Sequence, residues 1–126
     1  MQKSAAGAAA GTSFALLDQM VAVNDSTYHS AAAGGTTLGV TGSKAGATVT
    51  VSIPATITTA GAYGYSDVRK NGSSIHTSSG KYAPTAGNPV TDTFSADLVA
   101  GDQLTLYLRC SRGTITAKGG ATLTVT

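Results

Sequence analysis

Apolar residues occupy every second position in two stretches of the chain, 47–53 and 103–108. The apolar positions are Val49, Val51 and Ile53 in the first stretch and Leu104, Leu106 and Leu108 in the second. Successive side chains of a β-strand point to opposite faces of the sheet, so this alternation predicts two strands that each bury one face. Tyr107 is then expected to point away from the leucine face of its strand.

Turn signals separate these strands from other short β segments. Asn71-Gly72 is the strongest of them, because both central positions of a tight primed turn need a positive φ, and it predicts a hairpin between strands at 63–70 and 73–77. Further turns are predicted at 42–46, at 100–102 and at Gly119-Gly120, the last as a hairpin, and residues 78–90 are predicted to form a long loop. Further strands are predicted at 37–41, around Ile57, at 91–98 with Phe94 inside, at 113–117 and at 121–125.

Short strands separated by turn signals are typical of an all-β, antiparallel sandwich. The composition favours the same class, because the chain has 16 Gly, lacks Glu, is rich in Thr, Ala and Ser, and has only 11% charged residues. Threonine and valine suit strands, whereas the residues that fill ordinary helices are scarce. A length of 126 residues fits one domain, and we place the β-sandwich over residues 36–126.

Residues 1–35 are predicted to be an extended N-terminal arm and linker. Residues 4–11 contain only Ser, Ala and Gly, which offer too little apolar surface for a core. Such an arm is expected either to be held by a neighbouring subunit or to lie along its own domain. Residues 14–17 and 20–23 are apolar and predict a short helix or a first strand, followed by a connection over 24–35.

Two segments of the predicted sandwich resemble a known family. They are Tyr63-x-Tyr65-x-x-Val68-x-Lys70-Asn71-Gly72 and Phe94-Ser-Ala-Asp97-Leu98-x-Ala100-Gly101-Asp102-Gln103-Leu104-x-Leu106. Together they resemble the second half of jelly-roll heads of the complement-type and tumour-necrosis-factor-like kind, and similar sequences occur in bacteriophage capsid decoration and fibre proteins. The resemblance implies a jelly-roll β-sandwich that packs as a homotrimer. The chain differs from such heads in having few aromatic residues.

Charge and hydropathy argue against two classes of partner. The net charge is only +2, and the basic residues are scattered without interleaved aromatic residues, so we expect no nucleic acid partner. No apolar run approaches the 18 or more residues that a membrane helix needs, so we expect no membrane partner. Lys3 is followed by weakly apolar residues, which does not predict a secretory leader, and a single cysteine is compatible with synthesis in a host cytoplasm.

No group of titratable residues has the spacing of a catalytic or metal site. His29, His76 and Cys110 are the only residues of their types, and none lies in a His-x-x-x-His or Cys-x-x-Cys context. We predict that His76 is a solvated strand residue and that Cys110 keeps the buried phase of its strand. We therefore expect no enzyme activity, no cofactor and no metal.

The aspartates are spread singly along the chain, which does not suit a calcium loop. We interpret Asp102 as a turn residue whose side chain bonds nearby backbone. Asp67 is interpreted as a surface strand residue paired with Arg69 or Lys70.

The first functional hypothesis is a bacteriophage virion structural protein. In this hypothesis the sandwich decorates the capsid surface and binds the major capsid protein, or another virion protein, through its N-terminal arm. The alternative is a tail fibre or tip module that binds a receptor or carbohydrate such as a host-surface glycan, and exposed, clustered tyrosines would favour it. The residues predicted to contact a partner are Phe14, Leu16, Leu17, Tyr28, Tyr63, Tyr65, Tyr82 and Tyr107.

Overall fold

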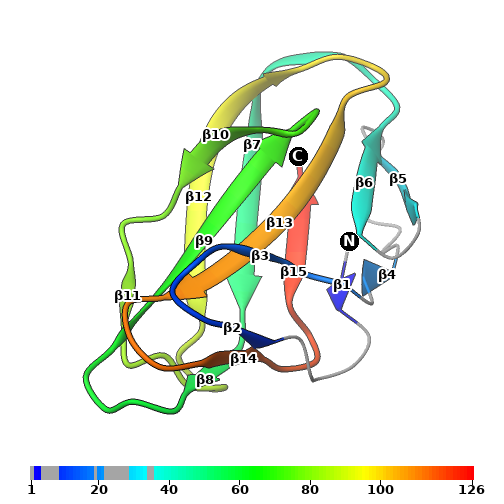
Figure 1. The fold of residues 1–126 in the computed structure, drawn as a ribbon. Coiled ribbons are helices and arrows are strands. Elements are labelled where there is room, and N and C mark those ends of the chain that lie inside the picture. Colours follow the sequence, from blue (N-terminus) through cyan, green and yellow to red (C-terminus); the bar gives the residue numbers. More distant parts are fainter. Residues whose placement is uncertain (1, 4–8, 19, 22–28, 34–35) are drawn as a thin grey trace.

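A computed structural model of the protein describes residues 2–3, 9–18, 20–21, 29–33 and 36–126. Every regular element in these residues is a β-strand, and every pair of neighbouring strands is antiparallel (Figure 1). The all-β, antiparallel fold predicted from the sequence is therefore confirmed. The strands form two larger sheets and one small sheet.

The first sheet is built around the long strand β7 (Lys44–Ile53). Its strand order is β12 (Val90–Leu98), β7, β15 (Thr122–Val125), β1 (Gln2–Lys3) and β4 (Met20–Val21). The register places Val51 between Asp92 of β12 and Leu123 of β15. Both neighbours of β7 come from sequence positions well after it, so this sheet closes only when the C-terminal half of the chain is in place.

The second sheet is built around β9 (Tyr63–Lys70) and β13 (Gln103–Cys110), which pair from Leu104 opposite Lys70 to Cys110 opposite Gly64. Its strand order is β10 (Ser73–Thr77), β9, β13, β6 (Thr37–Val40) and β5 (His29–Ala33). Two short strands extend it, because β11 (Lys81–Tyr82) pairs with the start of β9 and β3 (Ala15–Leu16) pairs with β13. A small third sheet of β2 (Ala9–Ala10), β14 (Ile115–Ala117) and β8 (Ala55–Ile57) lies at one end.

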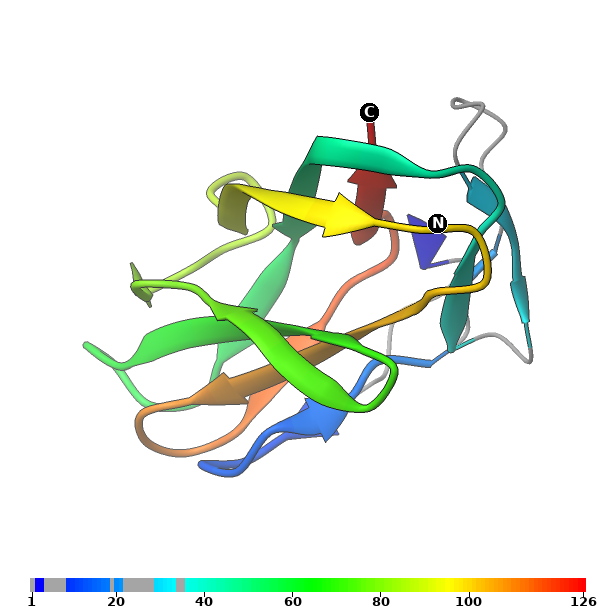
Figure 2. The ribbon, with the colours of Figure 1, turned by 90° about the horizontal axis from the view of Figure 1, so that it is seen from above.

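The two larger sheets pack face to face around one core. Seen from above, β12, β7 and β15 (yellow, teal and red) form one layer, and β10, β9 and β13 (green and orange) form the other (Figure 2). The predicted alternation is confirmed, since Val49, Val51 and Ile53 of β7 and Leu104, Leu106 and Leu108 of β13 are all buried in this core. Phe94 is partly buried and packs against the same core.

The Asn71-Gly72 hairpin is present as predicted. Asn71 and Gly72 have φ values of 52° and 88°, and Ser73 pairs with Lys70 across the turn. The backbone N–H of Asn71 also donates to the carbonyl of Gln103 at 2.9 Å. The turn is therefore tied to the neighbouring strand as well as closing its own hairpin.

The predicted hairpin at Gly119-Gly120 is wrong. β14 pairs with β2 and β8, whereas β15 pairs with β7 and β1, so the chain crosses here from the small sheet to the first large sheet. Gly120 does adopt a positive φ of 91°. A glycine pair indicates where a chain turns but not which strand the next segment joins.

The predicted turn at 42–46 is also wrong in extent, because β7 begins at Lys44. Gly46 has a φ of 64°, and the register opposite it shifts between Ala96 and Leu98. Its N–H donates to Asp97 Oδ1 at 2.7 Å. A glycine with positive φ at a register shift is a β-bulge, which lets the strand continue through a turn-like residue.

Part of the predicted arm packs on the sandwich. Ala10 and Leu17 are buried in the core, and the Leu17 N–H donates to the carbonyl of Leu106 at 2.9 Å. The apolar stretch was predicted to form a short helix or a strand, and residues 15–16 form a strand. Residues 29–33 were predicted to belong to a connection but form β5. The sandwich therefore includes described residues that precede position 36, where the sequence predicted it to begin.

Candidate interaction surface

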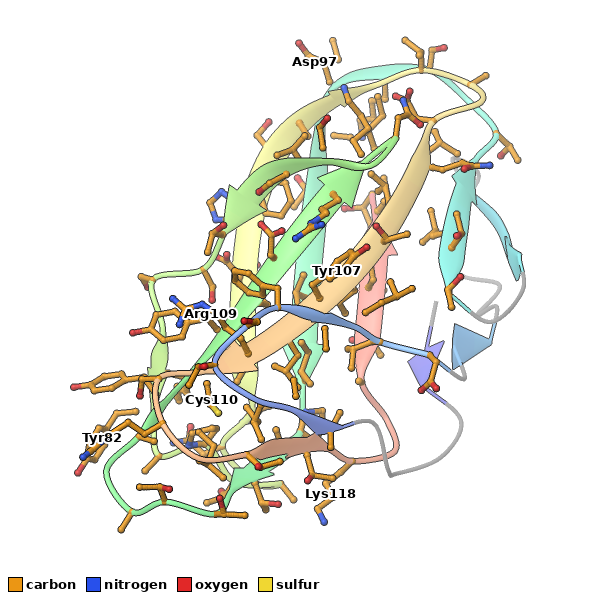
Figure 3. All side chains as sticks on the ribbon, viewed as in Figure 1. Tyr82, Asp97, Tyr107, Arg109, Cys110 and Lys118 are labelled. Carbon is orange, nitrogen blue, oxygen red and sulfur yellow. The ribbon has the colours of Figure 1, made fainter. Side chains whose placement is uncertain are left out.

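The outward face of the second sheet collects aromatic and charged side chains. Alternation along β9 directs Gly64, Ser66 and Val68 inward, where all three are buried. It therefore directs Tyr63 and Tyr65 outward. On β13 the leucines point inward and Tyr107 and Arg109 point outward, as the sequence predicted for Tyr107. Figure 3 shows Tyr107 and Arg109 along this strand and Tyr82 at the end of the sheet where β11 lies.

The register of β9 and β13 sets Tyr65 directly opposite Arg109. The guanidinium carbon of Arg109 lies 4.1 Å from the centroid of the Tyr65 ring and 5.2 Å from that of Phe14. Both distances are within the range of cation–π attraction. Among the described residues, no carboxylate forms an ion pair with Arg109.

Tyr63 and Tyr82 form an exposed aromatic pair at the end of this face. They are direct partners in the pairing of β9 with β11, and their rings make an edge-to-face contact with centroids 5.3 Å apart. Tyr63 is 42% exposed and Tyr82 is 60% exposed. Large aromatic side chains this open to solvent, next to one another, are characteristic of a contact surface more than of a core.

The predicted long loop carries part of this surface and supports it. Residues 81–82 of the loop form β11, and Gly80 just before it has a φ of 97°. A Cβ added at Gly80 would lie 2.6 Å from Cε1 of Tyr65, so the tyrosine ring rests directly on the glycine backbone. Only glycine allows both this conformation and this approach.

Arg69 contrasts with Arg109 because it has a carboxylate partner. Asp67 is buried, accepts hydrogen bonds from Ser74, from Thr77 at 2.8 Å and from Arg69 Nε at 3.0 Å, and so raises the pKa of the Arg69 guanidinium. Arg69 also stacks 3.9 Å above the centroid of the Tyr107 ring. The predicted pairing of Asp67 with Arg69 is confirmed, but its predicted surface position is wrong because β10 supplies two hydroxyls that cover it.

Six of the residues predicted to contact a partner lie on this one surface, which we name the tyrosine–arginine face. It consists of Phe14, Leu16, Tyr63, Tyr65, Tyr82 and Tyr107, together with Arg69 and Arg109. Leu16, which pairs with Tyr107, is 39% exposed, whereas Leu17 is buried in the core. Tyr28 lies outside the described residues. Sequence reasoning missed the two arginines. Arg109 follows Tyr107 by two residues and Arg69 follows Asp67 by two residues, so alternation along each strand puts the members of each pair on the same side of the sheet.

Cys110 and Asp102 have local partners of their own. Cys110 is buried, as predicted, and its Sγ lies 3.3 Å from the carbonyl oxygen of Gly113. Asp102 accepts hydrogen bonds from the Val99 N–H at 3.0 Å and from the Asn71 side chain at 2.9 Å, which lower the pKa of its carboxyl group. Its predicted role as a turn residue is confirmed.

A metal site needs several ligating side chains close together, and a membrane span needs a long apolar helix. Within the part of the chain that the structure describes, no three His, Cys, Asp or Glu residues come together as a metal site would require. No helix there is long and apolar enough to cross a membrane. Comparison with known proteins adds no relative, since no protein-family model matches the sequence and no curated protein is similar to it.

Proposed function

We propose that this chain is a non-catalytic recognition module displayed on a virion surface, and that it binds saccharides through the tyrosine–arginine face. The observation that carries the proposal is the exposed Tyr63–Tyr82 pair beside the stacked Tyr65 and Arg109. Tyrosine rings stack on sugar rings and add a hydroxyl for hydrogen bonding. The fold does not need these rings, because its core is filled by aliphatic residues.

The virion setting rests on the resemblance to jelly-roll heads in bacteriophage fibre and decoration proteins. A module of this kind is made in the host cytoplasm, assembles into the particle and meets the next host through a surface glycan. A homotrimer would present the face three times and so raise the avidity of weak saccharide contacts.

Capsid decoration is the second candidate, and the exposed Leu16 beside the half-buried Phe14 favours it. A specific protein contact buries on the order of 1,000 Å². The described part of the N-terminal segment is less suited to the role of a free anchor, because Ala10 and Leu17 are buried in their own sandwich. In this candidate the face itself would bind the major capsid protein.

A glycan array with the purified protein tests the proposal. We expect binding to a subset of glycans, lost when Tyr63 and Tyr82 are replaced with alanine. Val99 is 57% exposed and lies on the turn after β12, so Val99→Ala is the matched control and should bind as the wild type does. Absence of binding to any glycan, together with co-sedimentation with capsids, would replace the first candidate by the second.

A further inference from the structure

We infer that the saccharides bound at the tyrosine–arginine face are acidic, and that Arg109 binds their anionic group. This inference rests on the proposed function and adds the chemical class of the ligand. Its starting point is the contrast between two arginines on one face, of which Arg69 forms an ion pair with Asp67 and Arg109 contacts aromatic rings.

Among the residues that the structure describes, the packing of Arg109 leaves its hydrogen-bonding edge unused. Tyr65 and Phe14 both attract the guanidinium through their rings, and within the described residues no protein acceptor takes a hydrogen bond from it. A guanidinium has five N–H donors that lie in its plane, and stacking uses none of them. The planar fork matches a carboxylate or sulfate group in bidentate geometry. Two rings thus hold the cation in place while its donors stay free for an anion.

A second arginine, Arg112, lies near the exposed Tyr82. Arg112 Nη2 donates to the carbonyl of Gly61 at 3.4 Å, and a Cβ on Gly61 would lie 3.6 Å from both Arg112 Nη2 and the Tyr82 hydroxyl. Lys81 precedes Tyr82 on β11 but pairs with the inward-facing Gly64, so its side chain points to the opposite side of the sheet from Tyr82. No described carboxylate forms an ion pair with Arg109, Arg112 or Lys81. Within the described residues, Tyr65 and Tyr82 therefore each lie near an arginine that forms no ion pair with a carboxylate, which favours an anionic ligand over a neutral one.

Sugar stacking and anion binding can occur in a single ligand because the two features adjoin. Tyr63 and Tyr65 are two residues apart on the same face of β9, so their side chains are neighbours along the strand. A sugar ring placed on the Tyr63–Tyr82 pair therefore extends toward the Tyr65–Arg109 stack. A sugar that carries a carboxylate or sulfate group is able to stack on the tyrosines and to bind Arg109 at the same time.

Calorimetric titration with three matched oligosaccharides tests the inference: one containing hexuronate units, its carboxyl-reduced neutral form, and a sulfated form of that neutral chain. We expect the hexuronate to bind at least about tenfold more tightly than the neutral form, the scale of one charge-assisted hydrogen-bonded contact. Added salt should weaken its binding. Tight binding of the sulfated chain as well would assign the site to anionic sugars in general.

Arg109→Gln should remove the preference for the acidic sugar, so that the hexuronate and its neutral form bind with similar affinity. Lys118, which follows β14 at the end of the small sheet, offers the control Lys118→Gln with the same change of charge (Figure 3). Arg109→Lys keeps the charge without the fork and should retain only part of the preference, which gives a second test if Arg109→Gln unfolds.

Two results would overturn the inference. The first is equal affinity for the acidic and neutral oligosaccharides, with binding of both lost when Tyr63 and Tyr82 are replaced with alanine. This result would leave the proposed saccharide binding intact but show that Arg109 does not bind an anionic group. An equal loss in Arg109→Gln and Lys118→Gln would show a general charge effect instead of a site. No binding to any of the three chains or to the glycan array would contradict the proposed function itself.

Discussion

The imidazole of His76 stacks on the ring of Phe94, with centroids 4.3 Å apart and an interplanar angle of 12°. His76 belongs to β10 and Phe94 to β12, the edge strands of the two large sheets, so this contact joins the sheets along one open side of the sandwich. His76 Nε2 also lies 2.7 Å from Asp92 Oδ2. The prediction of a merely solvated histidine is therefore wrong, because alternation on β10 is broken by a register shift between Ser74 and His76 that turns the ring toward β12.

Replacing Phe94 with alanine should lower the free energy of unfolding by about 2–3 kcal/mol, because it removes a partly buried ring and the stacking contact of that ring with His76. His76→Phe keeps two stacked rings and should change stability by less than about 1 kcal/mol. Urea denaturation of the two variants measures both values. A Phe94→Ala protein as stable as the wild type would mean that the ring contact does not hold the sheets together.

Gly80→Ala should displace the Tyr65 ring and destabilise the protein by about 1–3 kcal/mol, since the new Cβ meets Cε1 at 2.6 Å and the φ of 97° is unfavourable for alanine. Thermal unfolding measures the loss of stability. Saccharide titration of the same variant should show weaker binding if Tyr65 and Arg109 act as one stack.

Two other glycines separate the causes of that effect. Gly72 has a φ of 88° but open space around it, so Gly72→Ala should show backbone strain alone, about 1–2 kcal/mol, and normal saccharide binding. Gly87 has open space and no positive φ, so Gly87→Ala should be neutral or slightly stabilising. Equal losses at Gly72 and Gly80 would show that contact with Tyr65 adds nothing.

The sequence was sufficient to predict the parts of the fold that depend on local periodicity. The buried positions of β7 and β13, the Asn71-Gly72 turn and the inward phase of Cys110 follow from alternation and turn chemistry, and all are confirmed. Strand partners are set by tertiary contacts instead, which is why Gly119-Gly120 was mistaken for a hairpin and Gly46 for a turn rather than a bulge. Local patterns do not encode such long-range pairing.

The same distinction applies to the candidate surface. Alternation placed Tyr63 with Tyr65 and turned Tyr107 away from the leucines, but only the register of β9 and β13 shows that Arg109 stacks on Tyr65. Asp67 was assigned to the surface because nothing in the sequence indicates that Ser74 and Thr77 would cover it.

Asp102→Asn should reduce the loss of stability in acid. The Val99 N–H and then the Asn71 side chain lower the pKa of Asp102 in the folded state. The stabilisation is therefore present above the unfolded pKa of about 3.9 and is lost as the pH falls through the lower, folded value. Melting temperatures between about pH 2 and pH 7 should fall less steeply in the variant, which should be about 1–2 kcal/mol less stable at neutral pH. Parallel curves for the two proteins would contradict this linkage.

Leu17→Ala should destabilise the protein by about 2–4 kcal/mol, because Leu17 is 2% exposed and packs in the core next to β13. Leu16→Ala is the matched control, since Leu16 is 39% exposed on the tyrosine–arginine face and its loss should cost less than about 0.5 kcal/mol. If the N-terminal segment served only to bind a neighbouring subunit, it would be dispensable for folding. A chain lacking residues 1–30 would then be as stable as the full-length protein. The burial of Ala10 and Leu17 predicts the opposite, a truncated chain with a clearly lower melting temperature, as scanning calorimetry of the three variants beside the wild type would show. Equal stability of the Leu17→Ala and Leu16→Ala proteins would return this segment to the role of an arm.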